Sequence, residues 1–290
     1  MLRVMATLRG RAFIECRCYH SPTVAPTRSR SFSVMARTPD FTPPQELFPH
    51  RLDYAEVAQN LFELVKDLCE VTPTDRVLDV GCGAGRLAGP LTGFLGPEGS
   101  YEGFDSSRER IDWCNENIAP HHPRFRFVVA DVYSGQYNPE ATTPASEYVF
   151  PYEDGEFDIV LLSSVFTHML PDDVAHYLDE IGRVMKPGGR AMITWFLLND
   201  EVERLLEEQK DRRHDPASNA HDALLSHDFG TYRTTNPRVP EHVIAYYEPW
   251  ARKAYASSGL EIVEPVHYGA WAGRTQALHN QDVVLARRLG

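Results

Sequence analysis

The alternation of short apolar runs with helical stretches constrains this chain more than any other feature. From residue 53 onward, runs rich in β-branched and aromatic residues recur at 76–81, 101–105, 125–131, 157–165 and 189–197. Helical periodicity is clearest between them or beside them at 53–71, 106–118 and 171–189. Strands that alternate with helices predict right-handed crossovers and a parallel sheet covered on both faces.

Two more apolar runs, 260–269 and 282–288, have no helical stretch between them and predict a closing antiparallel hairpin. The expected fold class is therefore α/β: a doubly wound, Rossmann-like seven-stranded sheet, mostly parallel, with an antiparallel C-terminal hairpin. The expected domain runs over 45–290 and includes a small lid insertion at about 200–240, where a charged helical stretch gives way to irregular sequence.

The first 36 residues differ in composition from the rest, with six arginines and a single acid. Such a segment is typical of a mitochondrial transit peptide, and the alternative is translated text upstream of a start at Met35. We expect residues 1–36 to be a leader outside the folded core. The cytoplasm is the expected compartment, with the mitochondrial matrix as the alternative if the leader is a transit peptide.

Charge and cysteine usage narrow the function classes. The net charge is -12, with the acids spread along the chain, which disfavours nucleic acid as a partner and favours a small neutral or cationic one. The chain has five cysteines without a paired C-x-x-C spacing, which argues against a disulfide framework and a zinc site. Apolar runs stay shorter than the roughly 18 residues that a membrane-spanning helix needs. The oligomeric state is open.

A glycine-rich segment, "VLDVGCGAGR", follows the first expected strand. We call its residues 81–86 the glycine loop. Gly81 and Gly83 would allow close backbone approach to a ligand, and Gly85 would let the next helix pack tightly. Asp79 precedes the loop, where a pyrophosphate would be repelled and a ligand with an ammonium group would not. No Gly-Lys-Ser/Thr follows, so a phosphate-binding P-loop is excluded.

From Asp53 to Leu198 the chain resembles the class I S-adenosylmethionine-dependent methyltransferases. "VLDVGCGAGR" resembles the first motif of that family, and "YEGFDSS", "VVADVY", "FPYEDGEFDIVLLSSVFTHML" and "EIGRVMKPGGRAMIT" resemble the later landmarks in order. The resemblance implies S-adenosylmethionine as cofactor. It implies a ribose-binding role for Asp105, adenine contacts at Asp131 and Val132, and a methionine-binding role for the glycine loop. The complete set of implied cofactor-binding residues is Asp79, Gly81, Gly83, Gly85, Asp105, Ser106, Asp131, Val132 and Ser163.

His168 is the candidate catalytic residue, because it follows the fourth strand on the rim where the resemblance places the methyl group. An imidazole titrates near neutral pH and could take a proton from a hydroxyl acceptor. The alternative is a structural histidine that hydrogen-bonds a loop. Some quinone-pathway relatives carry two glutamates before such a histidine as metal ligands. This chain has Ser163, Ser164 and Thr167 there, so we expect no metal at this loop.

Parts of the chain outside the common core should recognise the acceptor. Aromatic residues of the insertion and its surroundings could line a pocket or form a second layer of core: Trp195, Phe196, Tyr232, Tyr246, Tyr247 and Trp271. Arg233 or His227 could hold a polar acceptor. His214, His221 and His227 lie among acids, but scattered loop histidines are more often solvated than ligands. We expect no bound metal.

These patterns predict an S-adenosylmethionine-dependent methyltransferase that acts on oxygen of a small molecule, a sugar or a lipid-linked glycan. Two alternatives stay open. One is methyl transfer to nitrogen or carbon, and the other is a noncatalytic protein that binds S-adenosylmethionine as an assembly or regulatory partner.

Overall fold

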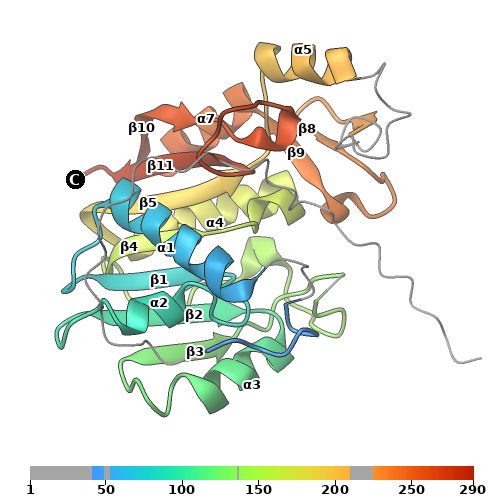
Figure 1. Ribbon diagram of the computed structural model, residues 1–290. Helices are drawn as coiled ribbons and strands as arrows, with labels where there is room; N and C mark the ends of the chain where they lie inside the picture. The colour runs from blue at the N-terminus through green and yellow to red at the C-terminus, as the bar shows by residue number, and fades with distance from the viewer. Residues whose placement is uncertain (1–40, 49–52, 136, 210–224) are drawn as a thin grey trace, which may run out of the picture.

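The computed structural model describes residues 41–48, 53–135, 137–209 and 225–290. The expected leader, residues 1–36, lies outside these ranges. Within them the chain builds a seven-stranded sheet, a small four-stranded sheet and helices on both faces of the large one (Figure 1). No helix in these ranges is long and apolar enough to cross a membrane.

The large sheet is doubly wound. From one edge to the other, its strands are β10 (Leu260–His267), β11 (Asp282–Arg288), β5 (Met185–Trp195), β4 (Phe157–Leu162), β1 (Arg76–Val80), β2 (Ser100–Asp105) and β3 (Phe125–Val129). The pairs among β5, β4, β1, β2 and β3 are parallel, whereas β11 pairs antiparallel with both β5 and β10. The predicted sheet with its C-terminal antiparallel hairpin is thus confirmed. The order of the strands reverses at β1 and β4, where open α/β sheets bind their ligands.

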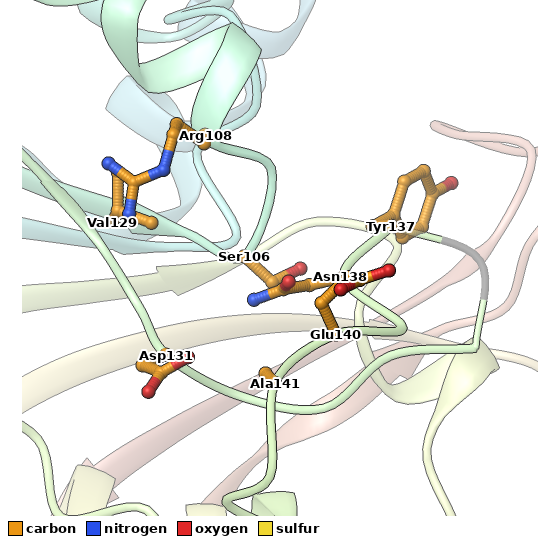
Figure 2. Close-up of a pocket in the computed structure, with 8 residues that line it drawn as sticks. All are labelled: Ser106, Arg108, Val129, Asp131, Tyr137, Asn138, Glu140 and Ala141. Carbon is orange, nitrogen blue, oxygen red and sulfur yellow. The ribbon is translucent and has the colours of Figure 1, made fainter.

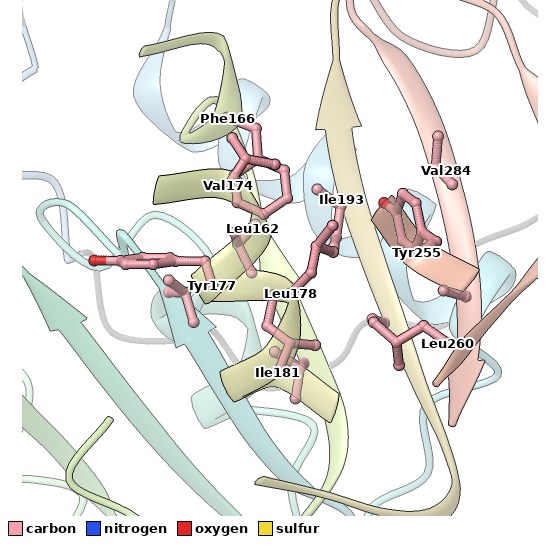
Figure 3. Packing of buried hydrophobic residues seen from close by; sticks show 14 of the residues in the cluster. Leu162, Phe166, Val174, Tyr177, Leu178, Ile181, Ile193, Tyr255, Leu260 and Val284 are labelled. Carbon is pink, nitrogen blue, oxygen red and sulfur yellow. The ribbon is translucent and has the colours of Figure 1, made fainter. Parts of the chain in front are cut away.

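Alternate residues of the central strands pack into two different cores. Leu78 and Val160 face one core, which contains α4 (Pro171–Val184) and α7 (Glu248–Ser257). Figure 3 shows part of this packing, with side chains of α4 against β4 and β5. Val77 and Ile159 face the other core, which contains α1, α2 and α3. The bounds of these three helices are Tyr54–Cys69, Ala88–Thr92 and Arg108–Asn117.

Local signals fix where two of these helices begin. Asp53 caps α1 by accepting a hydrogen bond of 3.0 Å from the Glu56 backbone N–H. Pro171 opens α4, followed by Asp172 and Asp173, which complement the positive end of the helix dipole. Both helices therefore start where the sequence signals place them.

The second sheet is formed by strands within and on either side of the insertion. Its strands are β6 (Leu197–Leu198), β9 (Ile244–Tyr247), β8 (Tyr232–Thr234) and β7 (His227–Asp228), in that order, and α5 (Asp200–Gln209) follows β6. Short 3-10 turns lie at η1 (Ala145–Glu147), η2 (Phe166–His168), η4 (Pro240–His242) and η5 (Ala270–Ala272). The Tyr246 hydroxyl donates a hydrogen bond of 2.5 Å to the carbonyl of Met169, just beyond η2. The insertion is thereby attached at the carboxyl end of β4.

Candidate functional site

The three glycines of the glycine loop differ in what surrounds them. All three have positive φ. A side-chain carbon at Gly81 would lie 2.5 Å from Val165, and one at Gly85 would lie 2.7 Å from Ile118. One at Gly83 would meet no atom within 4 Å. Gly81 and Gly85 therefore permit close packing inside the protein, and Gly83 borders open space where a ligand can approach the backbone.

Asp105 ends β2 directly beside this open face. Its Oδ2 accepts a hydrogen bond of 2.9 Å from the Gly83 backbone N–H, and its Oδ1 accepts one of 2.8 Å from Ser107 N–H. Each carboxylate oxygen has two lone pairs, so both can accept further hydrogen bonds. The buried Asp105 side chain is thus fixed in position with accepting capacity left for hydroxyl donors.

Asp79 lies in β1, before the loop, and is only 5% exposed. Its Oδ2 accepts a hydrogen bond of 2.7 Å from the Tyr101 hydroxyl. Burial raises the pKa of Asp79 to about 6, although the hydrogen bond and the Arg86 guanidinium act in the opposite direction. A carboxylate whose charge is costly to bury gains free energy when a cation binds nearby.

The first residue of α1 also touches the glycine loop. Tyr54 donates a hydrogen bond of 3.0 Å from its hydroxyl to the carbonyl oxygen of Ala84. Burial raises the pKa of Tyr54 well above its ordinary value, so the hydroxyl stays protonated and keeps donating. The N-terminal end of α1 therefore borders the loop.

A cavity of about 290 Å³ lies at the carboxyl ends of β2 and β3 (Figure 2). Its lining residues are Ser106, Arg108, Val129, Asp131, Tyr137, Asn138, Glu140 and Ala141. Of the two predicted adenine-contacting residues, Asp131 lines this cavity, together with Ser106, another predicted cofactor-binding residue. Val132 does not, because its side chain is buried in the core and its backbone bridges to Thr143.

The carboxyl end of β4 carries a strained turn. Ser164 has φ of +63°, a left-handed conformation that is uncommon for a non-glycine residue and often found at functional sites. Its backbone N–H donates a hydrogen bond of 2.8 Å to Thr194 Oγ1, which helps to hold this conformation. The preceding Ser163 accepts a hydrogen bond of 2.9 Å from Arg86 Nη2, which connects β4 to the glycine loop.

His168 lies in η2 and contacts the insertion. Its Nδ1 is 2.9 Å from the carbonyl oxygen of Glu241 in η4. Because a carbonyl only accepts, Nδ1 carries the proton of the neutral ring and Nε2 carries the lone pair. Burial lowers the pKa of His168, so the ring is neutral at physiological pH. This arrangement fits both a proton acceptor and a structural contact between the core and the insertion.

The six aromatic residues in and around the insertion differ in burial. Four of the six are buried in packed cores: Trp195, Phe196, Tyr246 and Trp271. Tyr232 and Tyr247 are half-buried. Arg233 forms an ion pair of 2.8 Å with Glu203, and His227 is exposed. These four buried residues are part of the protein core, which was one of the two roles expected for the aromatic residues.

In the described ranges, no group of three His, Cys, Asp or Glu side chains is arranged to hold a metal ion. Of the three histidines considered above, His214 and His221 lie outside the described residues.

Sequence reasoning missed three residues that contact the predicted site. Tyr54 contacts Ala84 of the glycine loop, and Tyr101 contacts Asp79. The partners in these pairs are 30 and 22 positions apart in the chain, and no local pattern indicates such pairs. The third residue, Arg86, directly follows the third glycine. Its position in the motif is the only feature of the sequence that indicates a contact with the site.

Comparison with known proteins agrees with this geometry. Residues 77–189 match the family model described as a methyltransferase domain. The chain is 35% identical over 119 residues to an uncharacterized methyltransferase of Schizosaccharomyces pombe, which covers 41% of this chain and 39% of that protein. It is 28% identical over 124 residues to the ubiquinone/menaquinone biosynthesis C-methyltransferase UbiE of Geotalea daltonii, covering 43% and 46% of the two chains. The chain thus spans less than half the length of these curated relatives.

Among solved structures, the PH0226 protein of Pyrococcus horikoshii has the same fold. The two structures superpose with a TM-score of 0.54 at 17% identity, covering 85% of this chain and 98% of that one. The family match, the order of the motifs and this fold agree. Residues 77–189 are thus similar to a methyltransferase domain, which supports the resemblance of this region to the class I S-adenosylmethionine-dependent methyltransferases, and the fold agrees with it.

Proposed function

We propose that this protein transfers a methyl group from S-adenosylmethionine to an oxygen atom of a small-molecule acceptor. One observation carries the cofactor half of the proposal. Asp105 is held by backbone N–H groups beside the open face of Gly83, next to a cavity that extends from the same strand ends. A nucleoside with an amino-acid tail suits this set, because it offers hydroxyls, a flat base and an ammonium group.

The residues present fit that cofactor in three places. Asp105 would accept hydrogen bonds from the ribose hydroxyls, and the cavity with Ser106 and Asp131 would take the adenine. The glycine loop would approach the methionine tail, where Asp79 would attract its positive charge. When bound, the cofactor supplies an electrophilic methyl group on a sulfonium.

The remaining work for this chain is to align the acceptor and to remove its proton. His168 is the residue proposed for proton removal. Its Nδ1 donates to the Glu241 carbonyl, and burial lowers the pKa of the ring, so the ring is neutral and its Nε2 lone pair is the proposed proton acceptor. The insertion, attached through this same contact, is proposed to act as the lid over the acceptor.

A carbon acceptor is the second candidate. The relatives include the C-methyltransferase UbiE, and carbon methylation need not use His168 as a base. A protein that binds the cofactor without turnover is a third, because the same cofactor-binding residues would serve it.

The test combines binding with group transfer. Calorimetry should detect S-adenosylhomocysteine binding, and tritium from labelled S-adenosylmethionine should appear in a pool of small metabolites. A His168→Ala variant should lose turnover while retaining cofactor affinity, and an exposed-site variant, His121→Ala, serves as the control. Binding without labelling would favour the noncatalytic protein. Full turnover in His168→Ala would remove the assignment of the base.

A further inference from the structure

The cavity at the ends of β2 and β3 has one wall that lies outside the motifs of the methyltransferase resemblance. That wall is formed by residues 137–143, which we call the cavity loop. The loop supplies four of the eight lining residues: Tyr137, Asn138, Glu140 and Ala141 (Figure 2). The loop is joined to α3, because the guanidinium of Arg110 lies 4.9 Å from the centroid of the Tyr137 ring, a cation–π contact.

Backbone hydrogen bonds hold the cavity loop at both ends. Thr143 accepts a hydrogen bond of 2.8 Å from the Tyr133 N–H, at the end of the loop that leads to η1. At the other end, Ser134 and Asn138 exchange two backbone hydrogen bonds of 3.1 and 2.9 Å. Glu140 lies between these two attachments, so the backbone that carries its side chain is fixed beside the cavity.

The charged side chains of the cavity divide into acceptors and a donor. Arg108, Asp131 and Glu140 line the cavity and are exposed. Within the residues that the structure describes, these three side chains make no hydrogen bond or ion pair. A carboxylate only accepts hydrogen bonds and a guanidinium only donates, whereas the hydroxyl of Ser106 and the amide of Asn138 can do either. A ligand in the cavity therefore meets two anionic acceptors and one cationic donor.

Purine bases differ at C6 in the group that such a set distinguishes. Adenine carries an amino group there, with two N–H donors, whereas hypoxanthine carries a carbonyl oxygen, which only accepts. A carboxylate can accept from the amino group and is repelled by the carbonyl oxygen. Ligand pockets usually measure roughly 300–1,000 Å³. The cavity of about 290 Å³ therefore suits one ring system better than a whole nucleoside with its tail.

We propose that Glu140 selects adenine over other purines by accepting a hydrogen bond from the C6 amino group of the cofactor. This inference rests on the proposed function and adds a specificity-determining residue from the cavity loop. Asp131, to which the resemblance assigns an adenine contact, supplies a second acceptor. Arg108 is a donor and suits a carbonyl base instead, so removal of Glu140 and removal of Arg108 should have different effects on the choice of base.

The experiment compares two ligands that differ at the C6 side of the base, S-adenosylhomocysteine and S-inosylhomocysteine. Calorimetry should show that the wild-type protein binds the adenosyl ligand about 30-fold more tightly. Glu140→Ala should reduce this preference to about fivefold or less, chiefly by weakening the adenosyl ligand. Arg108→Ala should leave the preference at its wild-type value or raise it. Because both residues are exposed, the variants should remain folded, which thermal melts would verify.

Exposed residues outside the cavity provide matched controls. Glu116→Ala and Arg124→Ala should leave both affinities unchanged. Equal binding of the two ligands by the wild-type protein would overturn the inference. An unchanged preference in Glu140→Ala would leave the choice of base to other residues, and an equal loss of affinity for both ligands would make Glu140 part of the wall only. Either result would also overturn it.

Failure of the proposed function has a different signature. The wild-type protein would then bind neither ligand, and the inference would fall with it. Binding of the adenosyl ligand without a preference for its base would instead contradict the inference alone.

Discussion

Two buried carboxylates, Asp79 near the glycine loop and Asp282 near the insertion, both have a raised pKa but have different surroundings. Burial raises the pKa of both Asp79 and Asp282 to about 6. Asp282 accepts hydrogen bonds of 2.7 Å from three N–H donors, those of Leu197, Gly269 and the Trp271 indole. In the ranges that the structure describes, Asp79 accepts a single one, from Tyr101.

This difference separates a structural role from a binding role. Asp282 uses its oxygens to join the start of β11 to β6 and η5, so its cost of burial is offset by contacts within the protein. Asp79 has accepting capacity left, and it lies four positions before Gly83 in the chain. We therefore expect Asp282 to stabilise the fold around β11, β6 and η5, and we expect Asp79 to affect what the glycine loop binds.

The largest expected effect is on the stability of the protein. Asp282→Ala would leave three buried donors without a partner and should lower the free energy of unfolding by about 3–5 kcal/mol. Asp282→Asn keeps one accepting oxygen and should lose less. Urea denaturation followed by circular dichroism measures both. A loss below about 1 kcal/mol in the alanine variant would contradict the structural role.

The next effect is on cofactor binding. Asp105→Ala removes the acceptor for the ribose hydroxyls and releases the Gly83 N–H, and should weaken S-adenosylhomocysteine binding by about 100-fold, or ~2.7 kcal/mol. Asp112→Ala, an exposed acid on α3, is the matched control. Calorimetry that finds the two variants within about threefold of each other would rule out the ribose assignment.

A pair of glycine variants separates ligand approach from packing. Gly83→Ala places a methyl group in open space at positive φ, at a backbone cost of about 1–2 kcal/mol, and should weaken cofactor binding about tenfold while the protein stays folded. Gly85→Ala has the same backbone cost and also collides with Ile118, so it should lose more stability. Thermal melts and calorimetry compare the pair. Equal stability losses, with binding unchanged in Gly83→Ala, would contradict this account.

The smallest effect concerns pH. Native Asp79 titrates at about 6 against an ordinary value of 3.8, so between these values the native state binds more protons than the unfolded state. Its contribution to stability therefore falls as pH rises from about 4 to 6, and Asp79→Asn should remove this fall. Binding of the cofactor's ammonium needs the ionised carboxylate, so affinity should rise with pH through about 6 in wild type and stay flat in Asp79→Asn. Melting curves and calorimetry at pH 5 and 7.5 test both, and parallel pH profiles in the two proteins would exclude the role of Asp79.

The comparison also explains which features could be predicted from the sequence. The parallel core, the glycine loop and the terminal hairpin depend on local periodicity and on residues a few positions apart. The interior faces of helices were harder to predict. In α1, Val57, Leu61, Leu64 and Leu68 recur at helical spacing and predict one apolar stripe. The buried face is instead Ala58, Leu61, Phe62, Val65 and Cys69. Both stripes have helical spacing, and the neighbouring core selects between them.

The region around the insertion and the start of β11 is held together by contacts that no local sequence pattern predicts. Asp282 and Leu197 are 85 positions apart, and Ser164 and Gln281 are 117 positions apart. Arg233, considered above as an acceptor ligand, pairs with Glu203, 30 positions away. Contacts of this kind are visible only in the folded chain, whereas Asp79, Asp105 and the glycines could be found in the sequence.

The central claim is that a buried, sparsely partnered carboxylate beside an open glycine backbone selects a positively charged nucleoside over a diphosphate. Titration calorimetry of the wild-type protein with S-adenosylhomocysteine and with NADH tests it most directly. We predict measurable heat and saturable binding for S-adenosylhomocysteine and none for NADH. Tight NADH binding without heat from S-adenosylhomocysteine would contradict the claim.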